Sequence, residues 1–166
     1  MKKIFAFIML AIGSALLTNV NAQEIADNAL GLRIGGNNGF GPEISYQRAI
    51  GSDNNRLEFD LGWRNSKHYD IVKLVGLYQW VWNIEGGFNW YAGAGAGIAN
   101  LDDDRLDPYY NDGAYIFIAG DIGVEYNFDI PLVLSLDLRP EIGFHDDYGA
   151  IDDFNPDFAL GIRYQF

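Results

Sequence analysis

Large apolar side chains alternate with small or polar ones along most of this chain, most clearly between residues 158 and 166. A β-strand points successive side chains to opposite faces, so a period of two predicts strands with one apolar and one polar face. Alternation of this kind predicts eight strands, at residues 30–36, 43–50, 57–65, 73–84, 88–101, 114–128, 132–144 and 158–166. The predicted fold class is therefore all-β.

The connections between these strands alternate in length. Tight turns are expected at residues 51–55, 85–87 and 129–131, whereas the connections after the third, fifth and seventh strands are longer. Only the connection after the first strand, at 37–41, is short where a long one is expected. The chain stops on an aromatic residue with no polar tail, which indicates that the last strand is paired at its very end. Together these features predict an eight-stranded antiparallel up-and-down transmembrane β-barrel.

The two faces of the predicted strands differ in chemistry. One face is almost wholly apolar, as in Leu57, Phe59, Leu61 and Trp63 on the third strand. The other face carries charged residues, namely Arg33, Glu43, Glu58, Asp60, Arg64, Asp121, Glu125, Asp137, Arg139, Glu141 and Arg163. A cationic side chain facing lipid near the bilayer midplane costs roughly 2 to 4 kcal/mol, so the charged face is predicted to line the barrel interior. Gln47, Gln79 and Gln165 share that face, and the lumen is expected to be plugged by an ionic network.

A soluble, lipocalin-like ligand-binding barrel is an alternative, because it would show the same alternation with the faces exchanged. Two features favour the membrane barrel. Gly93, Gly95 and Gly97 lie on the polar face of the fifth strand, and solvated strand faces avoid such glycines. Aromatic residues also gather toward strand ends, as interfacial girdles do, at Trp63, Trp80, Trp82, Trp90, Tyr126, Phe128, Tyr164 and Phe166.

The first 22 residues have the features of a secretory signal peptide. Lys2 and Lys3 precede an apolar run at 4–17, and Ala22 supplies the small residue expected before the cleavage point. The predicted organisation is thus a signal peptide at 1–22 and one barrel domain at 23–166. The chain has no cysteine, which leaves no disulfide or lipoprotein anchor. Its net charge of -12 disfavours binding to nucleic acid.

Two residues do not fit the alternation. Arg48 falls on the apolar face of the second strand, which indicates either that it snorkels to the headgroup level or that a bulge shifts the register; we favour snorkelling. Pro140 cannot donate a backbone hydrogen bond, so the seventh strand is expected to bulge or leave the sheet there.

From the signal peptide, the strand count, the turn asymmetry and the terminal Arg163-Tyr164-Gln165-Phe166, the chain resembles the OmpA/OmpX-type family of small eight-stranded outer-membrane barrels. The resemblance implies a porin-like fold in the outer membrane of a Gram-negative bacterium, with both termini periplasmic. It further implies a monomer without cofactor, in contact with membrane lipid and lipopolysaccharide. Tyr164 and Phe166 would form the C-terminal insertion signal read by the barrel-assembly machinery. With no further domain after Phe166, the wall-anchoring role of longer members is not transferred.

Aspartates are dense in two of the predicted outer loops. They are Asp102, Asp103, Asp104, Asp107 and Asp112 after the fifth strand, and Asp146, Asp147, Asp152, Asp153 and Asp157 after the seventh. Carboxylate oxygens suit divalent cations such as calcium or magnesium. Neither run has the spacing of a known calcium loop, and acidic loops are ordinarily solvated, so no metal site is assigned.

An outer-membrane lipid-modifying enzyme is a second alternative. His68 lies near Ser66 and Asp70, and His145 adjoins Asp146, so a nucleophile, a base and an orienting acid are within a short stretch of sequence. A loop histidine beside a serine is common by chance, and without geometry the motif is weak. We therefore expect no enzyme and no catalytic residue. The expected role is structural or surface-interacting, in adhesion or envelope integrity.

Overall fold

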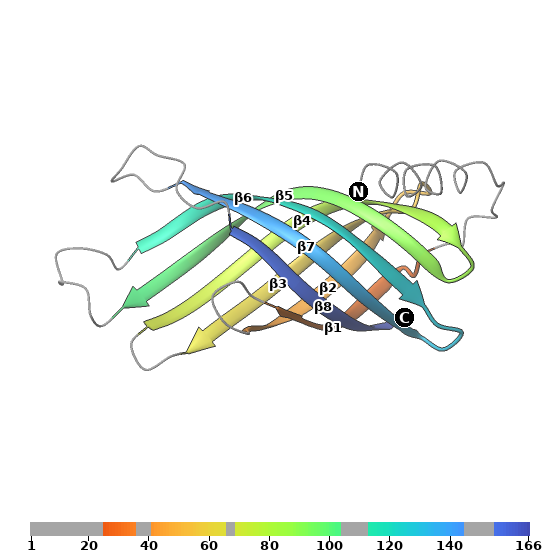
Figure 1. The fold of residues 1–166 in the computed structure, drawn as a ribbon, viewed down its shortest axis with the longest axis horizontal. Coiled ribbons are helices and arrows are strands. Elements are labelled where there is room, and N and C mark those ends of the chain that lie inside the picture. Colours follow the sequence, from red (N-terminus) through yellow and green to blue (C-terminus); the bar gives the residue numbers. More distant parts are fainter. Residues whose placement is uncertain (1–24, 36–40, 66–68, 104–112, 145–154) are drawn as a thin grey trace, which may run out of the picture.

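The computed structural model describes residues 25–35, 41–65, 69–103, 113–144 and 155–166. Eight strands form a closed barrel in which each strand pairs with its neighbours in sequence and the last pairs with the first (Figure 1). The strands are β1 (Asn28–Gly35), β2 (Gly41–Ile50), β3 (Asn55–Asn65), β4 (Tyr69–Glu85), β5 (Phe88–Asp103), β6 (Gly113–Asn127), β7 (Leu132–Phe144) and β8 (Asn155–Gln165). The predicted antiparallel eight-stranded fold is confirmed.

Strands β1 and β8 close the barrel in antiparallel register, with Arg33 opposite Gly161 and Gly31 opposite Arg163. Beyond the last strand residue, the backbone of Asn28 exchanges two hydrogen bonds with that of Phe166, at 3.1 Å and 2.9 Å. The C-terminus lies at the end of the barrel where the β4–β5 and β6–β7 turns lie, on the right in Figure 1. We call this the turn end and the opposite one the loop end. The part of the chain described here contains no helix long and apolar enough to span a membrane.

Residues with positive φ shape the tight turns. Gly51 (φ 68°) and Asn54 (φ 54°) lie in the turn between β2 and β3, and Gly86 (φ 54°) lies between β4 and β5. Hairpin turns that match the right-handed twist of the strands need this backbone region, which glycine and asparagine enter at low cost. The register between β4 and β5 shifts between Asn83 and Glu85, directly beside the second turn.

Several strands are longer than the alternation predicted. β4 begins at Tyr69, with Asp70 opposite Asp102, and β8 begins at Asn155, opposite Glu141. Backbone hydrogen bonds between strands form whether or not the side chains alternate. A hydrophobic pattern therefore does not detect strand ends that consist of polar residues. The β2–β3 turn is correspondingly shorter than expected, since Asn55 already belongs to β3.

The predicted bulge of β7 at Pro140 is wrong, and the predicted departure from the sheet is limited to two positions: the β6–β7 ladder is interrupted at Arg139 and Pro140 and then resumes. The β6–β7 ladder has the same register on both sides, with Ala119 opposite Glu141 and Ile122 opposite Leu138, and β7 continues to Phe144. On its other side Pro140 lies opposite Pro156 of β8. Two prolines therefore face each other in one pair of strands without shifting either ladder.

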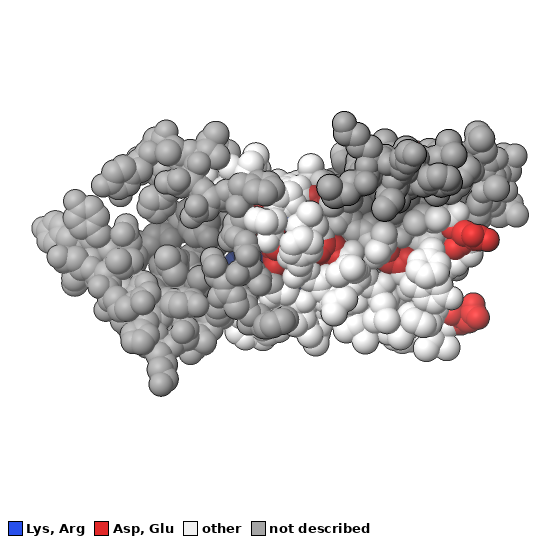
Figure 2. All heavy atoms as spheres, in the orientation of Figure 1, with Lys and Arg blue, Asp and Glu red and all other residues white. Residues whose placement is uncertain are grey.

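The apolar face of the strands points outward. Exposed fractions include 65% for Leu160, 51% for Leu136 and 48% for Trp63, whereas Arg33, Arg139 and Arg163 are at most 2% exposed. In Figure 2 the face in view is largely uncharged over the middle of the barrel, and its most prominent acidic patches lie at the turn end. A soluble lipocalin-like barrel would have these faces exchanged, so the structure does not support that alternative.

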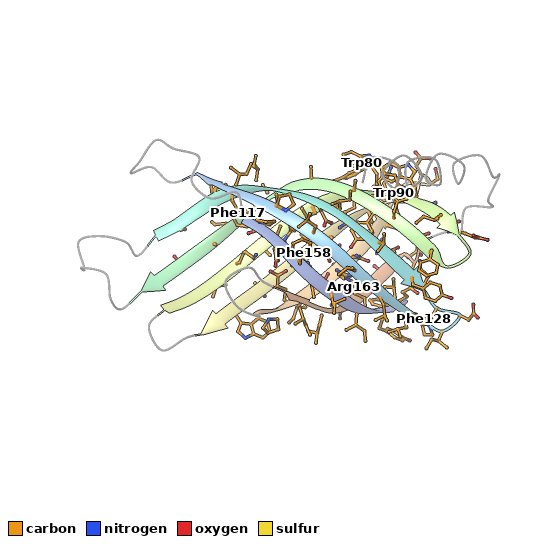
Figure 3. All side chains as sticks on the ribbon, in the orientation of Figure 1. Trp80, Trp90, Phe117, Phe128, Phe158 and Arg163 are labelled. Atoms are coloured by element: carbon orange, nitrogen blue, oxygen red, sulfur yellow. The ribbon has the colours of Figure 1, made fainter. Side chains whose placement is uncertain are left out.

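An aromatic girdle surrounds the turn end. Trp82 of β4 stacks on Trp90 of β5 with ring centroids 4.3 Å apart, and Tyr126 contacts both Phe88 (4.6 Å) and Phe128 (4.7 Å). In Figure 3, Trp80, Trp90 and Phe128 lie toward this end, while Arg163 lies within the outline of the barrel. Amphipathic rings concentrate at the level where hydrocarbon meets headgroups, so the girdle marks one edge of the apolar band.

Candidate functional site: an ionic network in the barrel lumen

The structure places the sequence-predicted interior residues in a lumen network made of two hydrogen-bonded clusters, one around Arg33 and Arg139 and one around Glu58 and Arg163. The exceptions are Arg64, whose side chain is outside the described set, and Gln165, which bonds to Asn127 instead. Every strand contributes at least one polar side chain to this network. Its members are Arg33, Glu43, Ser45, Gln47, Arg56, Glu58, Asp60, Lys73, Gln79, Asn89, Asp121, Glu125, Ser135, Asp137, Arg139, Glu141, Asp157 and Arg163. Because strand alternation sends every second side chain inward, the network follows directly from the sequence pattern.

Arg33 forms the first centre of the network. Its Nη2 and Nε lie 2.5 Å and 3.0 Å from Oδ1 of Asp137, and its Nη1 lies 3.0 Å from Glu43 and 2.7 Å from Asp157. One guanidinium thus joins carboxylates from β2, β7 and β8 to β1. A planar fork with five donors is suited to such multiple bonding.

Arg139 forms the second centre, toward the loop end. Its side chain is fully buried, and its nitrogens lie 2.8 Å from Asp60, 2.7 Å from Glu43 and 3.0 Å from Glu141. Lys73 contacts the same two glutamates, with Nζ 3.2 Å from Glu43 and 2.9 Å from Glu141. Glu43 is therefore shared by three cations, which compensates for its removal from water.

Arg163 and Glu58 form the third centre, with Nη2 and Oε1 2.5 Å apart. Arg163 also donates to the hydroxyls of Ser45 and Ser135, each at 2.8 Å. The other oxygen of Glu58 accepts hydrogen bonds of 2.8 Å from Gln47 and from Gln79. In the described lumen, Glu58 is the one carboxylate within ion-pair distance of Arg163.

Arg56 extends the network toward the turn end. Its Nη1 lies 2.8 Å from Glu125, its Nε donates to Gln79 at 2.6 Å, and its guanidinium lies 4.8 Å from the centre of the Tyr91 ring. Asn89 donates to the other oxygen of Glu125 at 3.0 Å. Beyond this level the lumen is lined by neutral amides, such as Gln165 and Asn127, which hydrogen bond at 2.8 Å.

One wall of the lumen is apolar rather than charged. Val75 and Leu77 of β4, Ala99 of β5, and Phe117 and Ala119 of β6 form a buried cluster. A side chain at Gly97 would collide with the Phe117 ring, so glycine at this position makes room for the aromatic side chain. Val75 and Leu77 have the same parity in the sequence as Gln79 of the polar face, but the alternation alone did not reveal this wall.

Carboxylates outnumber cations in the described lumen. Asp121 receives a hydrogen bond from Gln79, but no described Lys or Arg nitrogen lies within 4.0 Å of it. Oδ1 of Asp60, Oδ1 of Asp157 and Nη2 of Arg56 are buried without a hydrogen-bond partner. Some buried polar atoms of the network therefore lack a hydrogen-bond partner, and Asp121 is a described carboxylate without a cation beside it.

Sequence reasoning missed several members of the network, chiefly Arg56, Lys73 and Asp157. Arg56 has the same parity as Glu58, but it precedes the predicted third strand by one residue. Lys73 has the same parity as Val75, but it is the first residue of the predicted fourth strand and was not counted. Asp157 had been assigned to an acidic outer loop, and this is wrong: it is 7% exposed, on β8, in contact with Arg33. Extending the predicted strands by one residue would have found Arg56 and Asp157, and counting the parity of the first strand residue would have found Lys73.

The remaining sequence candidates lie outside the described residues or have side chains that are not described. These are Ser66, His68, Asp70, His145 and Asp146, together with the acidic runs at 102–112 and 146–153. Within the described ranges, no three His, Cys, Asp or Glu side chains are grouped to hold a metal ion. The ion pairs of the described site can hold the strands together, because the interior of the barrel is filled by its own side chains.

Comparisons with known proteins agree with this architecture. No family model and no curated protein matches the sequence. Among solved structures, the N-terminal β-barrel domain of OprF from Pseudomonas aeruginosa has a TM-score of 0.68 at 13% identity, covering 88% of this chain and 100% of that one. The Neisserial surface protein A, NspA, has a TM-score of 0.56 at 16% identity, covering 84% of this chain and 94% of that one.

A third similar structure is the attachment invasion locus protein Ail of Yersinia pestis, with a TM-score of 0.54 at 17% identity over 84% of this chain and 96% of that one. A designed transmembrane β-barrel is comparably similar, with a TM-score of 0.55 at 17% identity. At identities this low, the structural similarity establishes the fold but not a specific function. By its eight-stranded closed topology and these neighbours, the chain has the fold of the small outer-membrane β-barrels.

Proposed function

We propose that this chain is an integral protein of the bacterial outer membrane, with a structural or surface-interaction role and a plugged lumen. The observation that carries the proposal is the distribution of side chains in the barrel. Large apolar residues such as Leu136 and Leu160 are exposed over the outer surface, while Arg33, Arg139 and Arg163 are enclosed. At about 25 cal/mol per Å2 of apolar surface, transfer of this outer face from water into hydrocarbon stabilises the inserted state.

The proposed orientation places the turn end in the periplasm, so that both Asn28 and the C-terminal Phe166 lie on that side. Small bacterial barrels have short periplasmic turns and longer extracellular loops. The two longest connections here, at 104–112 and 145–154, are both at the loop end, whereas the β3–β4 connection, which was expected to be long, spans only 66–68. In this orientation the loop end would face lipopolysaccharide and the surroundings of the cell. The protein would act as a monomer, inserted by the barrel-assembly machinery, without cofactor and without a catalytic reaction.

The filled lumen supports a role other than transport. Side chains from all eight strands meet inside, and the Arg33, Arg139 and Arg163 centres follow one another along the axis. A solute crossing the barrel would have to separate these ion pairs. Breaking a buried pair costs about 3 to 5 kcal/mol, so a stable open channel is not expected.

The test has three parts. The purified protein should float with phospholipid vesicles and show heat-dependent gel migration, whereas a protein that stays soluble without detergent would contradict the membrane assignment. In planar bilayers we expect no stable conductance; a persistent large conductance would contradict the plugged lumen. A deletion strain assayed for envelope permeability and for adhesion then separates a structural role from a binding role.

A further inference from the structure

Arg48 is the exception among the cations of this barrel. The described inward-facing cations all form ion pairs with carboxylates: Arg33, Arg56, Lys73, Arg139 and Arg163. Arg48 points outward from β2 and is exposed, and no described carboxylate lies within ion-pair distance of it. The ladders of β2 with β1 and β3 run through Arg48 without a shift, so no bulge accounts for its direction.

Neighbouring side chains hold the Arg48 guanidinium in place. Nη1 of Arg48 donates to Oδ1 of Asn28 at 3.0 Å, and the hydroxyl of Tyr46 donates to the same oxygen at 2.8 Å. Asn28 is itself held by a hydrogen bond of 3.4 Å from Nδ2 to the carbonyl of Phe166. Among the described residues Nε and Nη2 of Arg48 have no partner, which leaves a two-donor fork free. That fork matches two oxygens of a phosphate group.

The depth of Arg48 matches a lipid phosphate. Ile50, the next outward residue toward the turn, is 37% exposed, so Arg48 lies one outward position inside the end of the apolar surface. Across the sheet Arg48 is opposite Leu57, and Leu57 is opposite Tyr78. Tyr78 contacts Trp80 edge to face at 5.1 Å, within the aromatic girdle. Rings of this kind lie at the level of the headgroups.

Beyond Arg48 the turn end carries only acidic residues among its described exposed charges. They are Asp27, Asp53, Glu85 and Asp129. Two of these are close to Arg48 along the backbone: the carbonyl of Asp27 accepts a hydrogen bond of 2.9 Å from Ala49, and Asp53 lies in the turn that follows β2. The surface therefore presents positive charge at the edge of the apolar band and negative charge farther out.

We propose that Arg48, positioned by Asn28 and Tyr46, binds the phosphodiester of a phospholipid whose headgroup carries a primary ammonium, and that Asp27 and Asp53 receive that ammonium. The order of charges on the protein is the complement of such a headgroup, in which the phosphate lies nearer the acyl chains. A headgroup with net negative charge would gain the contact with Arg48 but would be repelled by the two aspartates. The inference rests on the proposed membrane location.

Electron spin resonance of lipids labelled on the acyl chain tests the site. The protein is reconstituted in phosphatidylcholine vesicles with trace phosphatidylethanolamine, phosphatidylglycerol or phosphatidylcholine carrying the label, and the motionally restricted fraction is measured. We expect phosphatidylethanolamine to be enriched at the protein roughly two- to fivefold over phosphatidylcholine, the size typical of an exposed charge contact. Phosphatidylglycerol should be enriched less than phosphatidylethanolamine.

Three variants make the test specific. Arg48→Gln should lower the enrichment, because the ammonium is brought to Asp27 and Asp53 only while Arg48 holds the phosphate. Arg48→Lys should keep part of the enrichment because the charge remains without the fork. The double variant Asp27→Asn and Asp53→Asn should remove the preference for phosphatidylethanolamine over phosphatidylglycerol. As matched controls, Glu85→Gln and Asp129→Asn change exposed acidic residues at the end of β4 and in the β6–β7 turn, and they should leave the selectivity unchanged.

The contrary results are equally clear. Equal restriction of the three lipids by the unaltered protein, or unchanged selectivity in Arg48→Gln, would overturn the site. A preference for phosphatidylglycerol would overturn the role given to Asp27 and Asp53. Flotation and heat-dependent gel migration are measured on the same samples: a protein that inserts and folds but shows no lipid selectivity contradicts this inference alone, whereas one that does not insert contradicts the proposed function.

Discussion

Arg33 of β1 and Asp137 of β7 form an ion pair past the intervening strand β8, with Nη2 and Oδ1 2.5 Å apart. The two side chains are 2% and 3% exposed. Backbone ladders connect only adjacent strands, so this contact adds a connection that the ladders cannot make. The lumen network thus stabilises the closed barrel by connecting strands that are not adjacent. The number of partners of each charged side chain predicts how far its replacement lowers the free energy of unfolding.

Replacing Glu58 by Gln should be the most damaging of three isosteric substitutions. Glu58 is the one described carboxylate paired with Arg163, so the variant leaves a buried guanidinium without a counter-charge. We expect the free energy of unfolding to fall by about 3 to 5 kcal/mol. Urea unfolding in lipid vesicles, followed by tryptophan fluorescence, measures this. A loss below that for Asp137→Asn would contradict the assignment.

Replacing Asp137 by Asn should cost less. Arg33 loses the Asp137 carboxylate but keeps contacts with Glu43 and Asp157. The expected loss is about 1.5 to 3 kcal/mol, typical of a hydrogen bond to a charged group. The same unfolding assay should therefore rank this variant between Glu58→Gln and the unaltered protein. A loss equal to that of Glu58→Gln would show that the remaining partners of Arg33 do not compensate.

Replacing Asp121 by Asn should be neutral or stabilising. No described cation pairs with Asp121, and its hydrogen bond comes from the side-chain amide of Gln79. An asparagine carbonyl can accept that hydrogen bond while removing a buried charge without a counter-charge. We expect a change within about 0.5 kcal/mol or a gain. A loss as large as that of Asp137→Asn would mean that a cation accompanies Asp121 in the folded protein.

A methyl group at Gly161 should disturb the network sterically. A Cβ there would overlap Oγ of Ser135 and lie 2.5 Å from Nη1 of Arg163. We expect Gly161→Ala to destabilise the barrel by about 1 to 3 kcal/mol, the usual cost of overpacking. Adding Ser135→Ala removes the nearest atom, so the double variant should be less destabilised than the sum of the two single ones.

Gly76→Ala is the matched control for that substitution. Gly76 faces outward, and its added Cβ would meet the Phe59 ring at 3.5 Å, an ordinary contact distance. Its effect on the free energy of unfolding should stay within about 0.5 kcal/mol. If Gly76→Ala is as damaging as Gly161→Ala, loss of glycine in a strand, and not crowding inside the lumen, is responsible.

The eight strands and the assignment of their faces were predictable because, in a closed membrane barrel, every strand alternates between apolar residues facing lipid and polar residues facing the lumen. Where side chains alternate between lipid and lumen, as from Leu132 to Leu138, the pattern gives both the strand and its orientation. The strand ends were less predictable. Around Asn155 and Asp157 no large apolar residue marks the outward face, since Pro156 lies between them, and only the pairing with Glu141 and Arg139 shows that β8 has begun.

The partners within the lumen could not be predicted from the sequence. Parity places Arg33 inside, but which of the inward carboxylates it reaches depends on how the strands are staggered around the barrel. Asp157 is an example, since it lies far from Arg33 in the sequence and 2.7 Å from it in space. The effect of Pro140 was overestimated: the β6–β7 ladder is interrupted at Arg139 and Pro140, but it resumes in the same register and β7 stays in the sheet.

The side chain of Phe166 is expected to act in assembly more than in stability. Its backbone is hydrogen bonded to Asn28, while the ring is 61% exposed and stacks on Tyr164 at 6.3 Å. Phe166→Ala keeps the backbone bonds, so refolding of the purified protein into detergent should be nearly unchanged. In cells we expect a marked fall in the heat-modifiable, membrane-inserted fraction, because the terminal aromatic is the proposed insertion signal.

Phe158→Ala separates that role from general hydrophobicity. Phe158 lies on β8, the strand that ends just before Phe166; it also points outward and is 66% exposed, but it lies toward the opposite end of the strand. Loss of lipid-facing apolar area is therefore similar in the two variants, and only the position of the ring differs. Normal insertion of Phe158→Ala beside impaired insertion of Phe166→Ala would support a signal at the turn end. Equal impairment would assign both effects to the lost apolar surface and remove the special role of Phe166.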